Sequence, residues 1–338
     1  MTELDPIDAV RARPGMYVGN IEDGSGVLNV LLEVLANALD QHLAGRCSRV
    51  AIEIAADGTI AIADDGPGFA ADGADGLPPL DELLTRLSRR PTVDGHRPHI
   101  HLGCGGMGLC VVNALSERFE LRTIRAGVRT TASYARGRLV EPVTSAPANE
   151  PSGTRIRFKP DAQVFTHARV PRVELARRLE DLSFLAPRFA VSWAIAGDHL
   201  ATGGLAARVA LGVPCDIADV VAHAGTYETA SGPVDVAVAL AWRTSEYARA
   251  SIDSFVNLER TPEHGSHVDG LRDGVRAFFG DHAEAWLAKL VAAVSVVLAD
   301  VKYGSPTKDR LASPAVREPV AQATRASLAS MSLTSRRA

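Results

Sequence analysis

The chain has 338 residues, of which 46% are hydrophobic and 22% charged, and its formal net charge is −4. This is the composition of an ordinary globular protein, it excludes wholesale disorder and a fibrous repeat, and the length predicts two domains. The slight negative charge is not typical of a dedicated nucleic-acid-binding protein. Any contact with DNA therefore needs a local basic patch or a partner protein.

Cysteine spacing and hydropathy indicate the cellular compartment of the protein. The N-terminus lacks the pattern of a secretion signal, and no window approaches 18 uncharged apolar residues. The four cysteines form no CxxC pair, which indicates neither a zinc finger nor a disulfide framework. We therefore expect a cytoplasmic protein with no membrane partner. The cysteines are Cys47, Cys104, Cys110 and Cys215.

A first long helix is predicted over Ser25 to Ala44, because leucines recur there at three- and four-residue spacings and Gly45 stands just past the end. Glu33, Asn37 and Asp40 project from nearly the same side of it. A carboxylate that takes a proton from water, beside an amide oxygen offered to Mg²⁺, is the minimal equipment for phosphoryl hydrolysis. From the helix alone, a solvated polar face stays open as the alternative.

Apolar and polar residues alternate over 49–62 around the turn dipeptide Asp57-Gly58, which predicts an antiparallel hairpin. The hairpin leads into the segment Asp64-Asp65-Gly66-Pro67-Gly68. There a carboxylate at a strand end stands beside glycines that let a ligand approach the backbone. Dipeptides of this kind often mark only turns, so the segment alone is a weak signal.

A second helix is predicted over 78–90, followed by a stretch rich in Gly, Pro and His that is typical of a functional loop. The stretch ends in Gly103-Cys104-Gly105-Gly106-Met107-Gly108, directly before an apolar helix at 109–116. Closely spaced glycines at a helix N-terminus direct backbone N–H groups toward an anion such as phosphate. The segment fits neither a Rossmann nor a Walker motif.

The remaining elements complete two α/β units. Strand patterns at 117–125, 128–137 and 153–160 predict, with the helices, an α/β sandwich. The boundary falls between 185 and 210, and the domains are assigned as 1–200 and 201–338. The tail beyond Asp309 is predicted as a marginal helix that frays. A second set of elements begins near Pro187, with strands at 189–195, 234–243 and 251–258, a helix at 266–280 and an apolar strand at 290–303.

The order of six motifs resembles the ATPase region of gyrase B and topoisomerase IV, over about Asp8 to Val316: RARPGMYVG, LEVLANALDQ, DDGPG, GCGGMGLCVVNALS, GTRIRF and SPTKDRL. The resemblance implies an α+β fold, with a GHKL (Bergerat) α/β sandwich ATPase domain followed by a smaller α/β transducer domain. It implies ATP and Mg²⁺ as cofactors. Histidine kinases are disfavoured because no phosphoacceptor helix precedes the domain, and MutL is less similar because RPGMY and SPTKDRL favour the topoisomerase branch.

The resemblance also implies roles for individual residues. Glu33 resembles the general base for the lytic water, Asn37 the magnesium ligand and Asp64 the acceptor of a hydrogen bond from the adenine amino group, with Thr154 and Gly68 supporting the base. The triphosphate loop would be formed by Gly103, Gly105, Gly106, Met107 and Gly108, under a lid at about 89–102.

Lys308 is, as a lone loop lysine, solvated surface by default. The resemblance gives it another role, because it matches the lysine that the transducer domain sends to the γ-phosphate. A cation there stabilises the charge that grows in the transition state, and it links the nucleotide state to the position of the domain.

Several positions depart from the family. The family usually has an arginine at the position of Pro67, and at the position of Gln41 it has the glutamate that pairs with that arginine. The wall of the site on the adenine side therefore differs. Thr131 stands where the family has the arginine that binds aminocoumarins, so we expect weak novobiocin binding. Pro306 replaces a glutamine of the family, and Gly105 replaces a histidine. Both changes reduce the number of contacts with the phosphates and predict slow hydrolysis.

Two functions remain open on these grounds. The first is an ATPase that dimerises on nucleotide binding and serves a type II topoisomerase, with a partner subunit that cleaves DNA; the presence of both Glu33 and Lys308 favours it. The second is a stand-alone regulator or decoy that binds nucleotide or inhibitor with little turnover. The short segment before DAVRARPGMY and the chain end soon after SPTKDRL favour the second.

Overall fold

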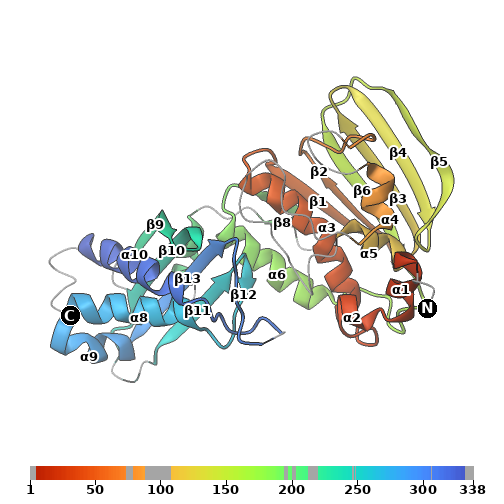
Figure 1. Ribbon diagram of the computed structural model, residues 1–338. Helices are drawn as coiled ribbons and strands as arrows, with labels where there is room; N and C mark the ends of the chain where they lie inside the picture. The colour runs from red at the N-terminus through yellow and green to blue at the C-terminus, as the bar shows by residue number, and fades with distance from the viewer. Residues whose placement is uncertain are drawn as a thin grey trace. The chain divides into compact units, whose positions relative to one another are not determined.

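The structure of the chain is a computed structural model, and it divides into two compact units (Figure 1). The first unit is Met1–Ser183 with Arg188–Leu200, and the second is Phe184–Pro187 with Ala201–Ala338. The residues that the structure describes are 5–73, 79–87, 108–193, 197–199, 203–211, 220–245, 247, 249–305 and 307–331.

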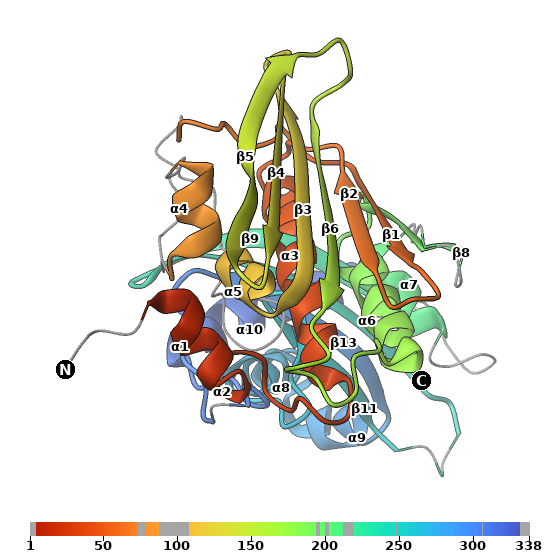
Figure 2. The same cartoon turned by 90° about the vertical axis from the view of Figure 1, so that its right-hand side faces the viewer.

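The first unit is built on an eight-stranded mixed sheet, in the order β5-β4-β3-β6-β2-β1-β7-β8 (Figure 2). β1 and β7 run parallel, and the other neighbours are antiparallel. The strands are β1 (Arg49–Ile54), β2 (Ile60–Asp64), β3 (Ser116–Arg125), β4 (Val128–Ala135), β5 (Arg138–Pro147), β6 (Gly153–Pro160), β7 (Ala190–Trp193) and β8 (Gly197–His199).

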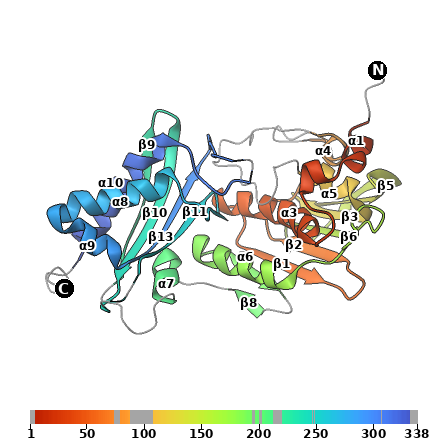
Figure 3. The ribbon, with the colours of Figure 1, turned by 90° about the horizontal axis from the view of Figure 1, so that it is seen from below.

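Helix α3 (Ser25–Leu43) lies along one face of this sheet (Figures 2 and 3). Its leucines at the predicted spacing are buried from Leu28 to Leu39, which confirms the helix. It ends where Gly45 takes a left-handed φ of 72° and the Arg46 N–H donates to the Gln41 carbonyl at 2.8 Å. The other helices of the unit are α1 (Pro6–Ala12), α2 (Gly15–Val18), α4 (Leu80–Thr85), α5 (Leu109–Ala114) and α6 (Arg172–Leu185), of which the last two residues belong to the second unit.

The second unit is a five-stranded sheet in the order β12-β11-β13-β10-β9. Its strands are β9 (Val221–Thr229), β10 (Gly232–Trp242), β11 (Ser251–Val256), β12 (Glu259–Arg260) and β13 (Leu290–Leu298). Its helices are α7 (Gly204–Leu211), α8 (Ser266–Phe279), α9 (Ala283–Ala288) and α10 (Arg317–Ala329), with 3₁₀ turns at Gly280–His282 and Pro314–Val316.

Both faces of this second sheet are covered, as Figure 3 shows. Val236 and Val238 of β10 belong to the same buried cluster as Leu271 of α8 and Val320 of α10. The intervening small residues of β10 pack with α7 on the other face. The strand is apolar on both sides for this reason. Among the helices of the described ranges, none is long and apolar enough to cross a membrane.

Two expectations about the elements were wrong. The strand expected at 189–195 to open the second unit is β7, and it pairs with β1 in the sheet of the first unit. The tail is more ordered than expected over its described residues, because α10 buries Val320, Ala323 and Leu328 against the core of the second unit. Hydropathy alone carries no information on which sheet a strand joins or whether a short helix finds a partner.

Candidate nucleotide site

Glu33 lies on α3 with only 7% of its surface exposed. The backbone N–H of Gly108, the residue before α5, donates to its Oε2 at 3.3 Å. Gly108 has a φ of 70°, a left-handed conformation that suits glycine. The carboxylate of the LEVLANALDQ motif and the last glycine of the GCGGMG motif are therefore in contact, although 75 residues separate them.

Asn37 stands one turn further along α3, and its Nδ2 donates to the Glu33 carbonyl at 3.0 Å. This hydrogen bond orients the Asn37 amide, so that its Oδ1 faces away from the Glu33 carbonyl. Within the described ranges, no group of three or more His, Cys, Asp or Glu side chains could hold a metal. An amide oxygen nevertheless fits Mg²⁺, which in nucleotide sites keeps several waters and takes further ligands from phosphates.

Asp64 ends β2, where it stands opposite Thr154 of β6. Burial raises the pKa of its carboxyl to about 6, although hydrogen bonds from the backbone N–H groups of Gly66 and Thr154 act to lower it. Thr154 is itself buried. The pair thus supplies a desolvated hydrogen-bond acceptor beside a buried hydroxyl, as the recognition of a ligand's amino group requires.

Gly68 closes the loop after Asp64 with a φ of 75°. A Cβ at this position would lie 2.3 Å from the Ile124 carbonyl oxygen, so only glycine fits. The neighbouring Phe69 N–H donates to Thr123 Oγ1 at 2.7 Å, and an Arg125 guanidinium N–H donates to the Gly68 carbonyl at 3.1 Å. The loop is therefore held against β3.

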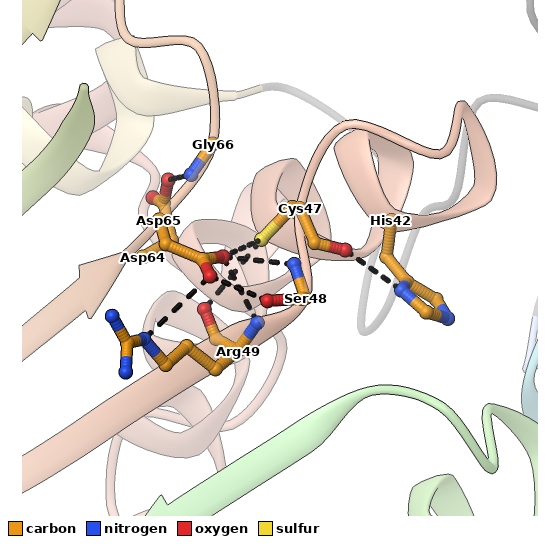
Figure 4. Close-up of polar contacts among 7 residues, drawn as sticks. All are labelled: His42, Cys47, Ser48, Arg49, Asp64, Asp65 and Gly66. Carbon is orange, nitrogen blue, oxygen red and sulfur yellow. Dashed lines mark hydrogen bonds and ion pairs between the residues drawn. The ribbon is translucent and has the colours of Figure 1, made fainter. Parts of the chain in front are cut away.

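Asp65 is a structural residue that the sequence interpretation missed (Figure 4). Its carboxylate accepts hydrogen bonds from the Ser48 N–H, the Ser48 hydroxyl and the Arg49 N–H at 2.8, 2.5 and 2.9 Å. Burial alone would raise its pKa, but these bonds hold it down to about 2. Asp65 thus fastens the end of β2 to the start of β1.

Cys47 and His42 complete the same polar cluster (Figure 4). The Cys47 thiol donates to Asp65 Oδ1 at 3.3 Å, and His42 Nδ1 lies 2.9 Å from the Cys47 carbonyl oxygen. Burial, followed by the hydrogen bond to Asp65, raises the pKa of the thiol to about 12. The thiol is therefore protonated at neutral pH, which excludes it as a nucleophile.

Lys308 belongs to the second unit, where its Nζ lies 3.7 Å from Glu259 Oε2 and its side chain is 22% exposed. It is therefore half-buried rather than the fully solvated lysine that a loop position predicts. The other residues expected near the phosphates lie outside the described residues: Gly103, Gly105, Gly106, Met107, the lid at 89–102 and Pro306.

Comparison with protein families agrees with this architecture. Residues 22–164 match the family of histidine kinase-, DNA gyrase B-, and HSP90-like ATPases, and residues 213–335 match the DNA gyrase B family. The DNA gyrase B protein of Campylobacter jejuni is 28% identical over 95% of this chain and 44% of its own length. That of Thermotoga maritima is 29% identical over 96% of this chain and 55% of its length. The chain thus spans about half the length of these relatives.

Solved structures share the fold over nearly the whole chain. The 43K ATPase domain of Thermus thermophilus gyrase B, in complex with an aminocoumarin, has a TM-score of 0.79 at 24% identity and covers 96% of this chain and 89% of its own. The gyrase B protein of Myxococcus xanthus has a TM-score of 0.73 at 26% identity, over 95% and 94%. These matches confirm the predicted α+β fold. The chain thus contains a domain that matches the histidine kinase-, DNA gyrase B-, and HSP90-like ATPase family, followed by a domain that matches the DNA gyrase B family.

Proposed function

We propose that the chain binds ATP with Mg²⁺ and hydrolyses it, as the ATPase module of a type II topoisomerase. The observation that carries the proposal is the contact between Glu33 and Gly108, with Asn37 one helical turn away. It supports a general base held in place beside a magnesium ligand, at the end of the glycine-rich segment and directly before α5. Plain nucleotide binding does not require such a base.

In the proposed reaction Glu33 takes a proton from water while the water oxygen attacks the γ-phosphorus. The bond from that phosphorus to the bridging oxygen breaks, and ADP leaves with the electron pair. Asn37 would hold Mg²⁺ through its amide oxygen, and the ion would neutralise charge on the phosphates. Lys308 is proposed to stabilise the charge that grows on the γ-phosphate.

The base of the nucleotide is proposed to lie against Asp64, Thr154 and Gly68. The Asp64 carboxylate accepts a hydrogen bond from the adenine amino group, and Gly68 supports the base through a loop that packs against β3. Desolvation at Asp64 supports this role, because a buried acceptor discriminates strongly against a group that cannot donate.

Dimerisation on nucleotide binding and service to a DNA-cleaving partner protein are part of the same proposal. The relatives matched over this chain are gyrase B proteins, and this supports a role in a topoisomerase. A regulator or decoy that binds nucleotide without turnover is the second candidate. The specific feature that favours it is the sequence change at Pro306 and Gly105, two positions of expected phosphate contact.

The test measures ATP binding by calorimetry and phosphate release at several protein concentrations, with and without Mg²⁺. Glu33→Gln should retain binding and lower turnover by about 10²- to 10⁴-fold, the usual contribution of a general base. Glu22→Gln, at an exposed carboxylate before α3, is the matched control and should leave both unchanged. Binding without turnover in the parent protein would favour the decoy, and absence of binding would refute both candidates.

A further inference from the structure

Gln41 continues the polar stripe of α3 beyond the residues that the proposed mechanism uses. It follows Asn37 by four residues and Glu33 by eight, so all three lie on one side of the helix. A Cβ placed on Gly66 would lie 3.7 Å from both Cβ and Cγ of Gln41, and 2.9 Å from Asp64 Oδ1. The Gln41 side chain and the Asp64 carboxylate therefore flank the same glycine.

The amide oxygen of Gln41 is buried and has no hydrogen-bond partner among the residues that the structure describes. Pro67, next to Gly66, has no N–H to donate and carries no charge. A buried acceptor is costly to leave without a donor, so this position suits a ligand that donates.

We propose that Gln41 determines base specificity, its amide oxygen accepting one hydrogen of the exocyclic amino group of the base while Asp64 accepts the other. The inference rests on the proposed binding of ATP and extends it to a second recognition contact. A 6-aminopurine supplies two amino hydrogens to two neighbouring acceptors. A 6-oxopurine presents an oxygen there instead, which both acceptors repel.

The test compares the affinities of ATP and inosine triphosphate, which carries a 6-oxo group, by calorimetry. The parent protein should prefer ATP. Gln41→Leu removes the acceptor at similar volume and should weaken ATP binding by about 2- to 12-fold, the range for one net hydrogen bond, with inosine triphosphate unchanged. Gln41→Glu keeps an acceptor oxygen and should retain the preference. Gln163→Leu, at an exposed glutamine, is the matched control.

The outcomes distinguish a failure of the proposed role of Gln41 from a failure of ATP binding. An unchanged preference in a folded Gln41→Leu protein, checked by its melting temperature, overturns the role of Gln41 and leaves ATP binding intact. If Gln41→Leu weakens the binding of inosine triphosphate rather than of ATP, the Gln41 amide acts as a donor. This result also overturns the proposed acceptor role of Gln41. Failure of the parent protein to bind ATP overturns the proposed function itself.

Discussion

Asp64 and Asp65 are consecutive residues whose carboxyl pKa values are shifted in opposite directions, to about 6 and to about 2. Desolvation decides the first, and three hydrogen bonds from Ser48 and Arg49 outweigh desolvation at the second. The alternation of a strand end turns the two side chains to different surroundings. The Asp64 carboxylate is the one proposed to bind the ligand, while the Asp65 carboxylate fastens the end of β2 to the start of β1.

Nucleotide affinity is expected to fall as the pH is lowered through about 6, because protonation removes the charged acceptor at Asp64. The measurement is the dissociation constant of ATP between pH 5 and pH 8. Phosphate ionisation also contributes near pH 6, so the control is Asp64→Asn, which should bind weakly with a flatter profile. A pH profile identical in the two proteins would contradict this role of Asp64.

Asp64→Asn should also stabilise the ligand-free protein at neutral pH. A carboxyl whose pKa is raised in the folded state gives most stability below its unfolded pKa, and that contribution is lost as the pH rises through about 6. A shift of this size amounts to about 3 kcal/mol at most, so a gain of about 1–3 kcal/mol in the free energy of unfolding is expected at pH 7.5. Urea denaturation measures it, and a loss of stability would exclude the desolvation argument.

Asp65→Ala should have the opposite effect. A carboxyl with a lowered pKa stabilises the fold above its unfolded value, and this contribution disappears as the pH falls toward about 2. We expect a loss of about 1–2 kcal/mol at pH 7 that shrinks in acid, because solvent partly screens this 27% exposed side chain. Asp72→Ala, at an exposed position, is the control. Equal losses in the two variants at pH 7 would show that the hydrogen bonds of Asp65 contribute nothing specific.

Gly68→Ala and Gly45→Ala form a matched pair, since both glycines have a positive φ, of 75° and 72°. A Cβ at Gly45 meets nothing within 4 Å, whereas one at Gly68 meets the Ile124 carbonyl at 2.3 Å. Gly45→Ala should therefore cost only the left-handed conformation, about 1–2 kcal/mol. Gly68→Ala should cost more and weaken ATP binding, because the loop must move from β3. Thermal unfolding and calorimetry compare them, and equal costs would contradict the close approach.

Sequence patterns anticipated the parts of the fold whose burial is periodic. The leucine spacing of α3 and the Asp57-Gly58 turn between β1 and β2 are examples. β5 escaped notice because nearly every residue of Arg138–Pro147 is exposed, so no alternation marks it. Asp65 escaped because its partners lie on the preceding strand, which only the folded register brings close.

The packing of α10 shows what one sequence cannot reveal about a helix of ordinary composition. A Cβ on Gly270 of α8 would lie 2.2 Å from the Arg317 carbonyl oxygen, and one on Gly274 would lie 2.6 Å from Thr324 Cβ. Two glycines on α8 thus let α10 approach closely. The tail alone has a weak apolar stripe, and its stability depends on this tertiary contact.

Lys308→Ala tests the last of the proposed catalytic roles. Lys308 Nζ lies 3.7 Å from Glu259 Oε2, and its side chain is half-buried, so its cation is held in a defined place. If Lys308 stabilises the transition state, alanine should lower turnover by about 10²- to 10³-fold with a much smaller change in ATP affinity, because the added charge develops after binding. Lys302→Ala, at an exposed lysine of the same unit, should leave both unchanged. Phosphate release and calorimetry separate turnover from binding, and a Lys308→Ala protein with full turnover would remove this residue from the mechanism.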